Sequence, residues 1–348
     1  MKTIIIILSW LSVLFTLIPF VKRDAWWIRV FDYPKIQFTV FSIVCLFLCF
    51  LFIGFNTPHE WFLLLSMLTC ILYHGYIIVP YTYFFPKQSL NCDSREEHNS
   101  ISLLIFNVYM YNKKSDEFLQ LVKENQPDLI LLVETDNWWK QQVEVLDQNY
   151  PFKMEYPVDN TYGMLLFSKY VLTDSHINFL VEENIPSFHT KIELPSKQMV
   201  QFYGLHPKPP VPGESLQSTE RDAELLLIGK KVRHQEMPVI VAGDLNDVAW
   251  SYTSKLFLRI SELLDPRIGR GFYNSFHAQY PMFRCPLDHV FHSNHFKLLT
   301  LKRLYRCGSD HFPIFIQLCY QKEAPEQQDT PAADKADIIL AKQKINAI

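Results

Sequence analysis

The segment RCGSDHFPIFIQL (residues 306–318) places an acid and a histidine directly before an apolar run. Earlier in the chain, VIVAGDLND (residues 239–247) ends a second apolar run with an acid, an amide and another acid. Short apolar runs rich in β-branched and aromatic residues predict buried strands. Polar side chains at strand ends lie at a sheet edge, where loops on a rigid scaffold build functional sites. These segments therefore predict a sheet-based domain with a site at the ends of its strands.

Other segments extend this pattern over residues 100–320. Five further apolar runs predict strands: ISLLIFNV (101–108), PDLILLVE (127–134), GMLLFS (163–168), MVQFYGLH (199–206) and LDHVFHS (287–293). Three amphipathic stretches predict helices: KSDEFLQLVKENQPD (114–128), STERDAELLLIGKKVRHQ (218–235) and WSYTSKLFLRI (250–260). Strands that alternate with helices indicate an α/β domain, and its size suits a single hydrophobic core.

The first 85 residues predict a membrane domain. Three apolar runs without Asp, Glu, Lys or Arg cover 3–21, 36–55 and 61–79, the last with one histidine, His74, and a helix needs about 20 residues to cross a bilayer. A cleaved leader is the alternative interpretation of the first run. Three transmembrane helices are favoured, because the run exceeds a usual signal core, lacks a small-residue cleavage site and precedes two more spans.

Charge in the loops predicts the orientation of these helices. The first connection carries Lys22, Arg23, Arg29 and Lys35, whereas the second, NTPHE (56–60), carries no Lys or Arg. Basic loops prefer the cytoplasm. The pattern predicts a cytoplasmic location for the first connection and for the large domain, although Lys2 at the N-terminus opposes it.

Composition limits the function of the rest of the chain. Residues 86–348 contain 28 basic and 33 acidic residues, which disfavours a strongly basic nucleic-acid-binding face. Seven cysteines occur without a CxxC pair, so neither a zinc site nor a disulfide framework is predicted. The polar segment 86–99 predicts a linker, and the Gln-, Ala-, Pro- and charge-rich segment 321–348 predicts a disordered tail, within which DIILAKQKINAI (337–348) could form a short helix.

Polar residues at the strand ends form the candidate site. They are Asn107, Glu134, His206, Asp244, Asn246, Asp288, Asp310 and His311. Carboxylate and amide oxygens bind hard divalent cations, a free aspartate can activate water, and histidines can contact phosphoryl oxygens or donate a proton. This set suits metal-assisted attack of water on a phosphoester. Acyl transfer is disfavoured by the lack of a G-x-S-x-G motif, and no nucleotide-binding P-loop occurs.

Each of these residues also has a structural interpretation. Asn107 could close a turn, and Asp244 and Asn246 could be ordinary turn residues, because Asp and Asn favour turns. His311 could be a core histidine bonded to Asp288. The functional interpretation depends on the ordered set and not on any single member.

Six motifs in a fixed order carry a resemblance to a known family. They are FNV (106–108), LLVE (131–134), GLHP (204–207), GDLND (243–247), LDHVF (287–291) and GSDHFP (308–313). On these motifs the chain resembles the endonuclease/exonuclease/phosphatase superfamily, which has the DNase I-like fold, and bacterial membrane-anchored members in particular. The resemblance implies a four-layer α/β sandwich of two packed mixed sheets with outer helices, preceded here by three transmembrane helices. It also implies a multi-pass protein of the bacterial inner (cytoplasmic) membrane.

The resemblance implies a metal site. Glu134 would be the principal Mg²⁺ ligand, with Asn107 beside it and Asp310 near the metal or its waters; Mn²⁺ is the alternative ion. Many nuclease members have an acid two residues after the first Asn, where this chain has Tyr109. This departure removes one ligand position and weakens a DNA-repair interpretation.

The resemblance also implies roles around the reacting phosphate. Asp244 would orient or activate water, and Asn246 would hold the phosphate and that carboxylate. His206 would contact the phosphoryl group or assist the leaving oxygen. His311 would bind a phosphoryl oxygen, with Asp288 fixing its tautomer.

Three hypotheses for the function stay open. The leading one is a membrane-anchored Mg²⁺-dependent phosphoesterase, acting on a phosphodiester or phosphomonoester, with a lipid-linked substrate favoured by the tether. A nuclease that acts on DNA or RNA is the second, and a catalytically silent binding scaffold is the third. Arg221 and Lys208 are further candidates for contacts with a substrate phosphate, or solvent-exposed charges.

Overall fold

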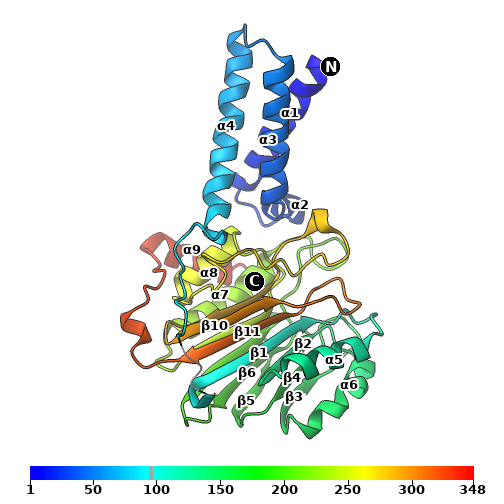
Figure 1. Cartoon of the computed structure of the whole chain (residues 1–348), viewed down its shortest axis with the longest axis vertical. Helices are drawn as coiled ribbons and strands as arrows, with labels where there is room; N and C mark the ends of the chain where they lie inside the picture. The colour runs from blue at the N-terminus through cyan, green and yellow to red at the C-terminus, as the bar shows by residue number, and fades with distance from the viewer. Residues whose placement is uncertain (94–96) are drawn as a thin grey trace.

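The computed structural model describes residues 1–93 and 97–348, and part of the predicted linker, residues 94–96, lies outside the described residues. Three helices are long and apolar enough to cross a membrane, and they project together from one side of the domain (Figure 1). They are α1 (Lys2–Leu17), α3 (Lys35–Phe52) and α4 (Pro58–Ile78). The short helices α2 (Trp26–Arg29) and η2 (Val30–Asp32) lie in the connection between α1 and α3.

The domain contains two mixed sheets. The first has the order β10-β11-β1-β2-β4-β3, and its strands in chain order are Ser100–Asn107, Leu129–Val133, Phe152–Tyr156, Met164–Ser168, Phe296–Arg303 and Ile314–Tyr320. The second has the order β5-β6-β7-β8-β9, with strands Leu172–Asn178, Ser187–Glu193, Met199–Leu205, Val239–Asp244 and Asp288–His292. The β1–β2 and β7–β8 pairs are parallel, and the other pairs are antiparallel.

Three apolar clusters hold these layers together. Inner-facing side chains such as Leu103, Leu131 and Phe202 form the core between the two sheets. On the outer face of the first sheet, Phe106 packs with helices α5 (Ser115–Asn125) and α6 (Asn137–Val143). On the outer face of the second sheet, Tyr203 packs with α7 (Thr219–Arg233) and α8 (Tyr252–Ser261). These clusters confirm the predicted four-layer α/β sandwich, because each sheet buries both faces.

The C-terminal segment differs from its predicted disorder. Residues Lys335–Ile345 form helix α9, which begins with a capping box between Asp334 and Asp337. Arg259 on α8 donates two hydrogen bonds of 2.7 and 2.8 Å to Asp337, and Ala341 is buried against Leu226 and Leu256. The polar composition misled the prediction, because α9 is held by ion pairs and needs only a narrow apolar contact.

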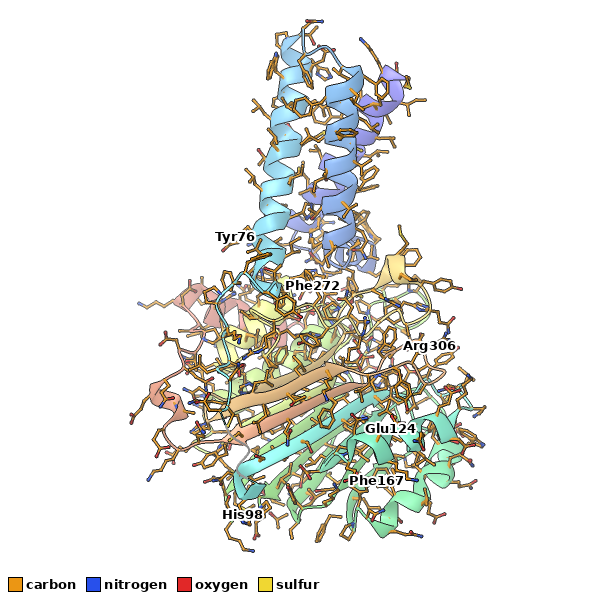
Figure 2. The ribbon with its side chains drawn as sticks, in the orientation of Figure 1. Tyr76, His98, Glu124, Phe167, Phe272 and Arg306 are labelled. Carbon is orange, nitrogen blue, oxygen red and sulfur yellow. The ribbon has the colours of Figure 1, made fainter. Side chains whose placement is uncertain are left out.

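The three apolar helices and the domain share a packed junction. Ile77 and Tyr81, at the end of α4, are buried against Trp250 and Leu287 of the domain. Figure 2 labels Tyr76 at the same end of α4, with Phe272 on the adjacent surface of the domain. The segment after α4 is also tied to the domain, since the Cys92 amide donates to the Leu298 carbonyl at 2.8 Å.

Candidate active site

The sheet register brings the candidate residues to one edge of the sandwich. Asn107 is the last residue of β1 and pairs with Val133, the residue before Glu134. In the second sheet, Asp244 at the end of β8 pairs directly with Asp288 at the start of β9. Parallel strands end at the same edge, and an antiparallel neighbour begins there, so residues distant in sequence meet. The two sheets therefore contribute acids from opposite sides of one site.

Asn107 connects the carboxylates of the two sheets. Its Nδ2 donates to Glu134 Oε1 at 2.8 Å and to Asp244 Oδ2 at 2.9 Å, and its Oδ1 accepts from the Tyr109 amide at 3.0 Å. Burial raises the pKa of Glu134 to about 7, although the hydrogen bond from Asn107 lowers it. The protein groups around Glu134 therefore do not fully compensate the negative charge of its carboxylate.

His311 and Asp288 form a buried, charged pair. His311 Nδ1 lies 2.7 Å from Asp288 Oδ2, and its Nε2 lies 3.6 Å from Asp244 Oδ2. Burial alone would lower the pKa of His311, but the Asp288 and Asp244 carboxylates raise it to about 10. Burial also raises the pKa of Asp288, an effect that the adjacent imidazolium opposes. We therefore assign an imidazolium whose Nε2–H points toward the acids of the site.

His206 provides a second histidine in a different protonation state. It follows the end of β7, is buried, and has its ring centroid 5.6 Å from that of Tyr162. Burial lowers its pKa, so the ring is neutral where His311 is charged. Its Nδ1 has no hydrogen-bond partner among the described residues. A buried polar atom without a partner is costly unless a ligand or water satisfies it.

Two site residues and a nearby glycine have positive φ values. Glu134 and Asn246 adopt positive φ values of 59° and 50°, a conformation that is uncommon for residues other than glycine. Gly243 has a φ of 148°, and a Cβ there would lie 1.8 Å from the Leu205 carbonyl oxygen. Glycine is therefore required at this position, and its absence of a side chain lets β8 lie against β7 just before Asp244.

Asn246 and Arg221 stabilise the loop after β8. The backbone N–H of Asn246 donates to Asp244 Oδ1 at 3.0 Å, and its side-chain Nδ2 donates to the Pro207 carbonyl at 2.9 Å. Arg221 is buried, pairs with Asp222 and Asp247, and donates to the Asn246 carbonyl at 2.7 Å. The structure thus corrects the predicted substrate contact of Arg221: its guanidinium lies beneath the loop and is engaged by protein groups. Lys208 pairs with Glu182 at 3.0 Å.

Two serines that the sequence analysis did not select support the site. Ser309 Oγ donates to the Asn107 carbonyl at 2.8 Å and accepts from the His311 amide at 2.9 Å. Ser275 Oγ accepts from the Asp288 amide at 3.0 Å. Ser309 lies within the GSDH motif and could have been selected on that basis, whereas no sequence pattern around Ser275 indicates its role.

The residues present fit a divalent cation. Only Oε1 of Glu134 accepts a hydrogen bond from a described residue, which leaves Oε2 as a ligand atom. The negative charge of the Asp310 carboxylate also raises the pKa of Glu134. Asp244, Asp288 and His311 also offer ligand atoms within 4.8 Å of one another. Because Asp288 and His311 already bind each other, the Glu134 side suits a hard cation with oxygen ligands better.

Comparisons with known proteins agree with this geometry. Residues 104–311 match the model of the Endonuclease/Exonuclease/phosphatase family. A search of curated proteins finds no match. Among solved structures, the endonuclease/exonuclease/phosphatase from Bacteroides vulgatus is 17% identical, with a TM-score of 0.53, and the alignment covers 64% of this chain and 99% of that one. The human nocturnin catalytic domain with bound sulfate is 16% identical, with a TM-score of 0.53 and coverage of 70% and 99%. A protein of the same description from Beutenbergia cavernae is 13% identical, with a TM-score of 0.51 and coverage of 64% and 72%.

These likenesses confirm the fold, and the family match extends over more than half of the chain. The family supports a metal-dependent hydrolase of phosphoester bonds. Because the matched residues run from β1 to His311, they include every strand end described above. The chain therefore belongs to the endonuclease/exonuclease/phosphatase family.

Proposed function

We propose that this protein is a membrane-anchored, Mg²⁺-dependent phosphoesterase that hydrolyses a phosphodiester or phosphomonoester, with a lipid-linked substrate favoured. The observation that carries the proposal is the edge where a charged Asp288–His311 pair, a neutral His206 and the carboxylates of Glu134 and Asp244 converge. One charged and one neutral histidine beside two acids can provide both electrostatic stabilisation and proton transfer.

The residues of the chain divide the hydrolysis between them. Asp244 orients a water and accepts its proton as the water oxygen bonds to phosphorus. The imidazolium of His311 donates a hydrogen bond to a phosphoryl oxygen as negative charge develops there. Neutral His206 donates a hydrogen bond from its ring N–H to the leaving oxygen as the bond of that oxygen to phosphorus breaks. The proton taken up by Asp244 then passes through solvent to the departing oxygen. Glu134, with Asn107 and Asp310 beside it, would hold Mg²⁺, which when bound neutralises charge on the phosphoryl group.

An exposed apolar loop supports a lipid-linked substrate. Tyr280, Met282 and Phe283 are 56%, 75% and 67% exposed, and the loop lies beside the membrane helices, since Gln37 of α3 donates to the Met282 carbonyl at 2.9 Å. The same loop reaches the site, because the Phe276 ring lies 5.1 Å from that of His311. An apolar surface between membrane and active site suits a substrate whose tail stays in the bilayer.

The full chain in detergent provides the first test. Hydrolysis of bis-p-nitrophenyl phosphate and p-nitrophenyl phosphate is measured with and without Mg²⁺, beside Glu134→Gln, Asp244→Asn and His311→Ala. We expect metal-dependent hydrolysis that each variant loses while thermal unfolding shows a folded protein. Preference for the monoester would identify a phosphatase, and full activity in both acid variants would refute the mechanism.

The same preparation separates the remaining hypotheses. A nuclease would nick plasmid DNA with Mg²⁺ or Mn²⁺ and show a steep salt dependence, because nucleic-acid binding releases counterions. A silent scaffold would neither hydrolyse phosphoesters nor bind a divalent metal in calorimetry.

A paired substitution tests the lipid preference. Met282→Ser with Phe283→Ser should lower the rate on a phosphoester lipid in vesicles by about tenfold, since two large apolar side chains no longer enter the interface. Hydrolysis of the soluble diester should stay at the wild-type rate. Val145→Ser, which changes an apolar side chain 52% exposed elsewhere, is the matched control. Equal losses on both substrates would argue against a lipid interface.

A further inference from the structure

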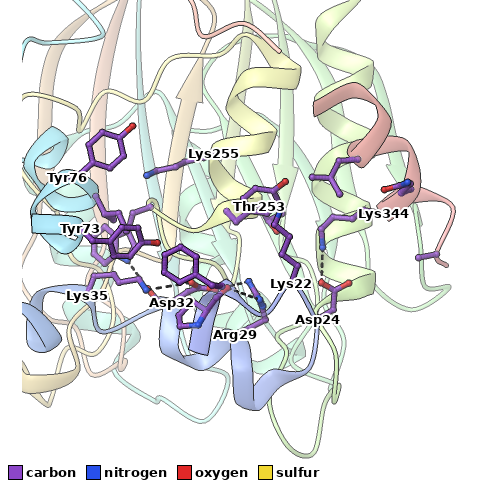
Figure 3. Close-up of a pocket in the computed structure, with 18 residues that line it drawn as sticks. Lys22, Asp24, Arg29, Asp32, Lys35, Tyr73, Tyr76, Thr253, Lys255 and Lys344 are labelled. Carbon is purple, nitrogen blue, oxygen red and sulfur yellow. Dashed lines mark hydrogen bonds and ion pairs between the residues drawn. The ribbon is translucent and has the colours of Figure 1, made fainter. Parts of the chain in front are cut away.

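A cavity of about 460 Å³ lies at the junction between the membrane helices and the domain, and it shares no residue with the candidate active site (Figure 3). Its walls come from the end of α1, the α1–α3 connection, the end of α4, and helices α8 and α9. Cavities of about 300–1,000 Å³ accommodate small ligands. The volume is therefore sufficient for a phosphate-bearing headgroup.

Basic side chains outnumber acidic ones in the lining. The basic ones are Lys22, Arg29, Lys35, Lys255 and Lys344, and the acidic ones are Asp24 and Asp32. Both acids are already engaged, because Asp24 pairs with Lys344 at 2.8 Å and Asp32 pairs with Arg29 at 3.1 Å. Three lysines thus remain to supply the excess positive charge.

Lys35 is the strongest indication of a missing anion. Its side chain is 2% exposed, and its Nζ has no hydrogen-bond partner among the described residues. It forms an ion pair with the Asp32 carboxylate at 3.8 Å, which is too far for a hydrogen bond and is shared with Arg29. A buried ammonium without an acceptor is unfavourable, and a phosphate oxygen would provide one.

Lys255 and Lys22 add to this charge. Within residues 1–93 and 97–348, neither has a hydrogen bond or ion pair to the chain, and Lys22 contacts only the face of the Tyr252 ring, at 5.8 Å. Burial lowers the pKa of Lys255, and no carboxylate opposes this effect. An anion bound beside Lys255 would provide the opposite charge that it lacks and would offset its repulsion with Lys35.

The position of the cavity indicates where the anion comes from. Phe20 and Tyr76, which line it at the ends of α1 and α4, are 57% and 78% exposed on the surface of the helix bundle. These helix ends mark the boundary between the apolar spans and the domain. Aromatic residues at this level and basic residues beneath it match the headgroup layer of a membrane.

We propose that this cavity binds the phosphate of an anionic phospholipid, with the lysines around the headgroup and the acyl chains along α1 and α4. A soluble phosphate ester shares the headgroup chemistry, but it would gain nothing from the exposed aromatic residues at the opening. The proposal does not depend on the hydrolytic activity proposed above, since the two sites have no residue in common.

The test uses the delipidated full chain in detergent without added divalent metal. Dioctanoyl phosphatidylglycerol is titrated, and binding is followed by native mass spectrometry and by the rise in thermal unfolding temperature that a ligand of the folded state produces. Dioctanoyl phosphatidylcholine tests the need for net negative charge. Glycerol 3-phosphate tests the need for acyl chains.

We expect saturable binding of phosphatidylglycerol and at least about tenfold weaker binding in the Lys35→Gln, Lys255→Gln double variant, because each charged contact to phosphate is lost. Lys22→Gln, at an exposed position where the side chain makes no packing contribution to the core, should weaken binding several-fold. Lys230→Gln, an exposed lysine outside the cavity, should bind as the wild type does. Wild-type affinity in the double variant and in Lys22→Gln, or equal binding of phosphatidylcholine, would overturn the proposal. Equal stabilisation by glycerol 3-phosphate would reassign the site to a soluble anion.

Discussion

The charge state of His311 depends on the neighbouring carboxylates, of which Asp288 is the nearest. Asp288 at 2.7 Å and Asp244 at 3.6 Å raise the pKa of His311 to about 10 against the effect of burial. A histidine whose pKa rises on folding stabilises the fold fully below its ordinary pKa of about 6.5, and this stabilisation is lost as pH rises through the folded value. The imidazolium therefore persists throughout the neutral range, where it can meet a phosphoryl oxygen.

Asp288→Asn tests this dependence. The amide keeps the size of the side chain but removes its charge, so the pKa of His311 should fall and the proton should be lost at lower pH. We expect the alkaline limb of the kcat/KM profile to move down by at least about one pH unit, with activity partly restored at acidic pH. A profile of unchanged shape at a uniformly lower rate would mean that Asp288 only orients the ring.

At the scale of elements, the connection between α1 and α3 contacts the active-site loop. The Tyr33 hydroxyl donates to the Asn246 carbonyl at 2.7 Å and accepts from Arg221 at 3.3 Å. The indole of Trp250 donates to the Asp32 carbonyl at 2.9 Å. The loop that carries Asn246 is therefore held partly by residues of the α1–α3 connection, which links the three apolar helices to the geometry of the site.

Tyr33→Phe should lower kcat several-fold with little change in KM, because the Asn246 loop loses a buried hydrogen bond worth about 1 kcal/mol. Hydrolysis of the soluble diester by the full chain measures this effect. Tyr150→Phe is the matched control: its hydroxyl donates to the Pro127 carbonyl at 2.8 Å, at the opposite end of β2 from Glu134. It should lose similar stability without a change in kcat. Equal kcat in both variants would show that the membrane-domain contact does not position the loop.

Helix α9 provides a second prediction at this scale. Deletion of residues 332–348 removes the Arg259–Asp337 pair and the contact of Lys344 with Asp222 at 2.7 Å, and it uncovers the buried Arg221–Asp222 pair. We expect the free energy of unfolding to fall by about 2 kcal/mol or more, which corresponds to several degrees in melting temperature. Differential scanning calorimetry of the full and shortened chains measures it. An unchanged melting temperature would restore the interpretation of this segment as a disordered tail.

The way in which each element is stabilised explains whether it could be predicted from the sequence. Central strands such as β1, β2 and β8 are buried throughout and therefore read as apolar runs. The edge strand β5, LTDSHIN, was missed because its side chains are mostly exposed and polar. The site residues at strand ends were found because their motifs adjoin those runs. The position of Arg221 could not be found in this way, since it depends on Asp222 and Asp247, which only the fold buries beside it.

At the scale of the whole molecule, the two ends of the helix bundle differ in charge. The connection with Lys22, Arg23, Arg29 and Lys35 packs against the domain, where Ala25 forms a bridge with Gln217. The α3–α4 turn lies at the far end of the bundle, and the N-terminus lies on that side too (Figure 1). Packing thus places the basic loop and the active site on the same side of any membrane that the helices cross.

Basic loops are retained in the cytoplasm, so we predict a cytoplasmic domain and an N-terminus on the opposite face. An epitope at each terminus, probed with protease on intact bacterial spheroplasts, measures this orientation. The N-terminal epitope should be cleaved in intact spheroplasts, and the C-terminal one only after lysis. Exchanging the four basic residues for glutamine should reduce this bias, since their charge is then no longer available to hold the loop inside. Cleavage of the C-terminal epitope in intact cells would place the active site outside, and the accessible phosphoester lipids would then be those of the outer leaflet.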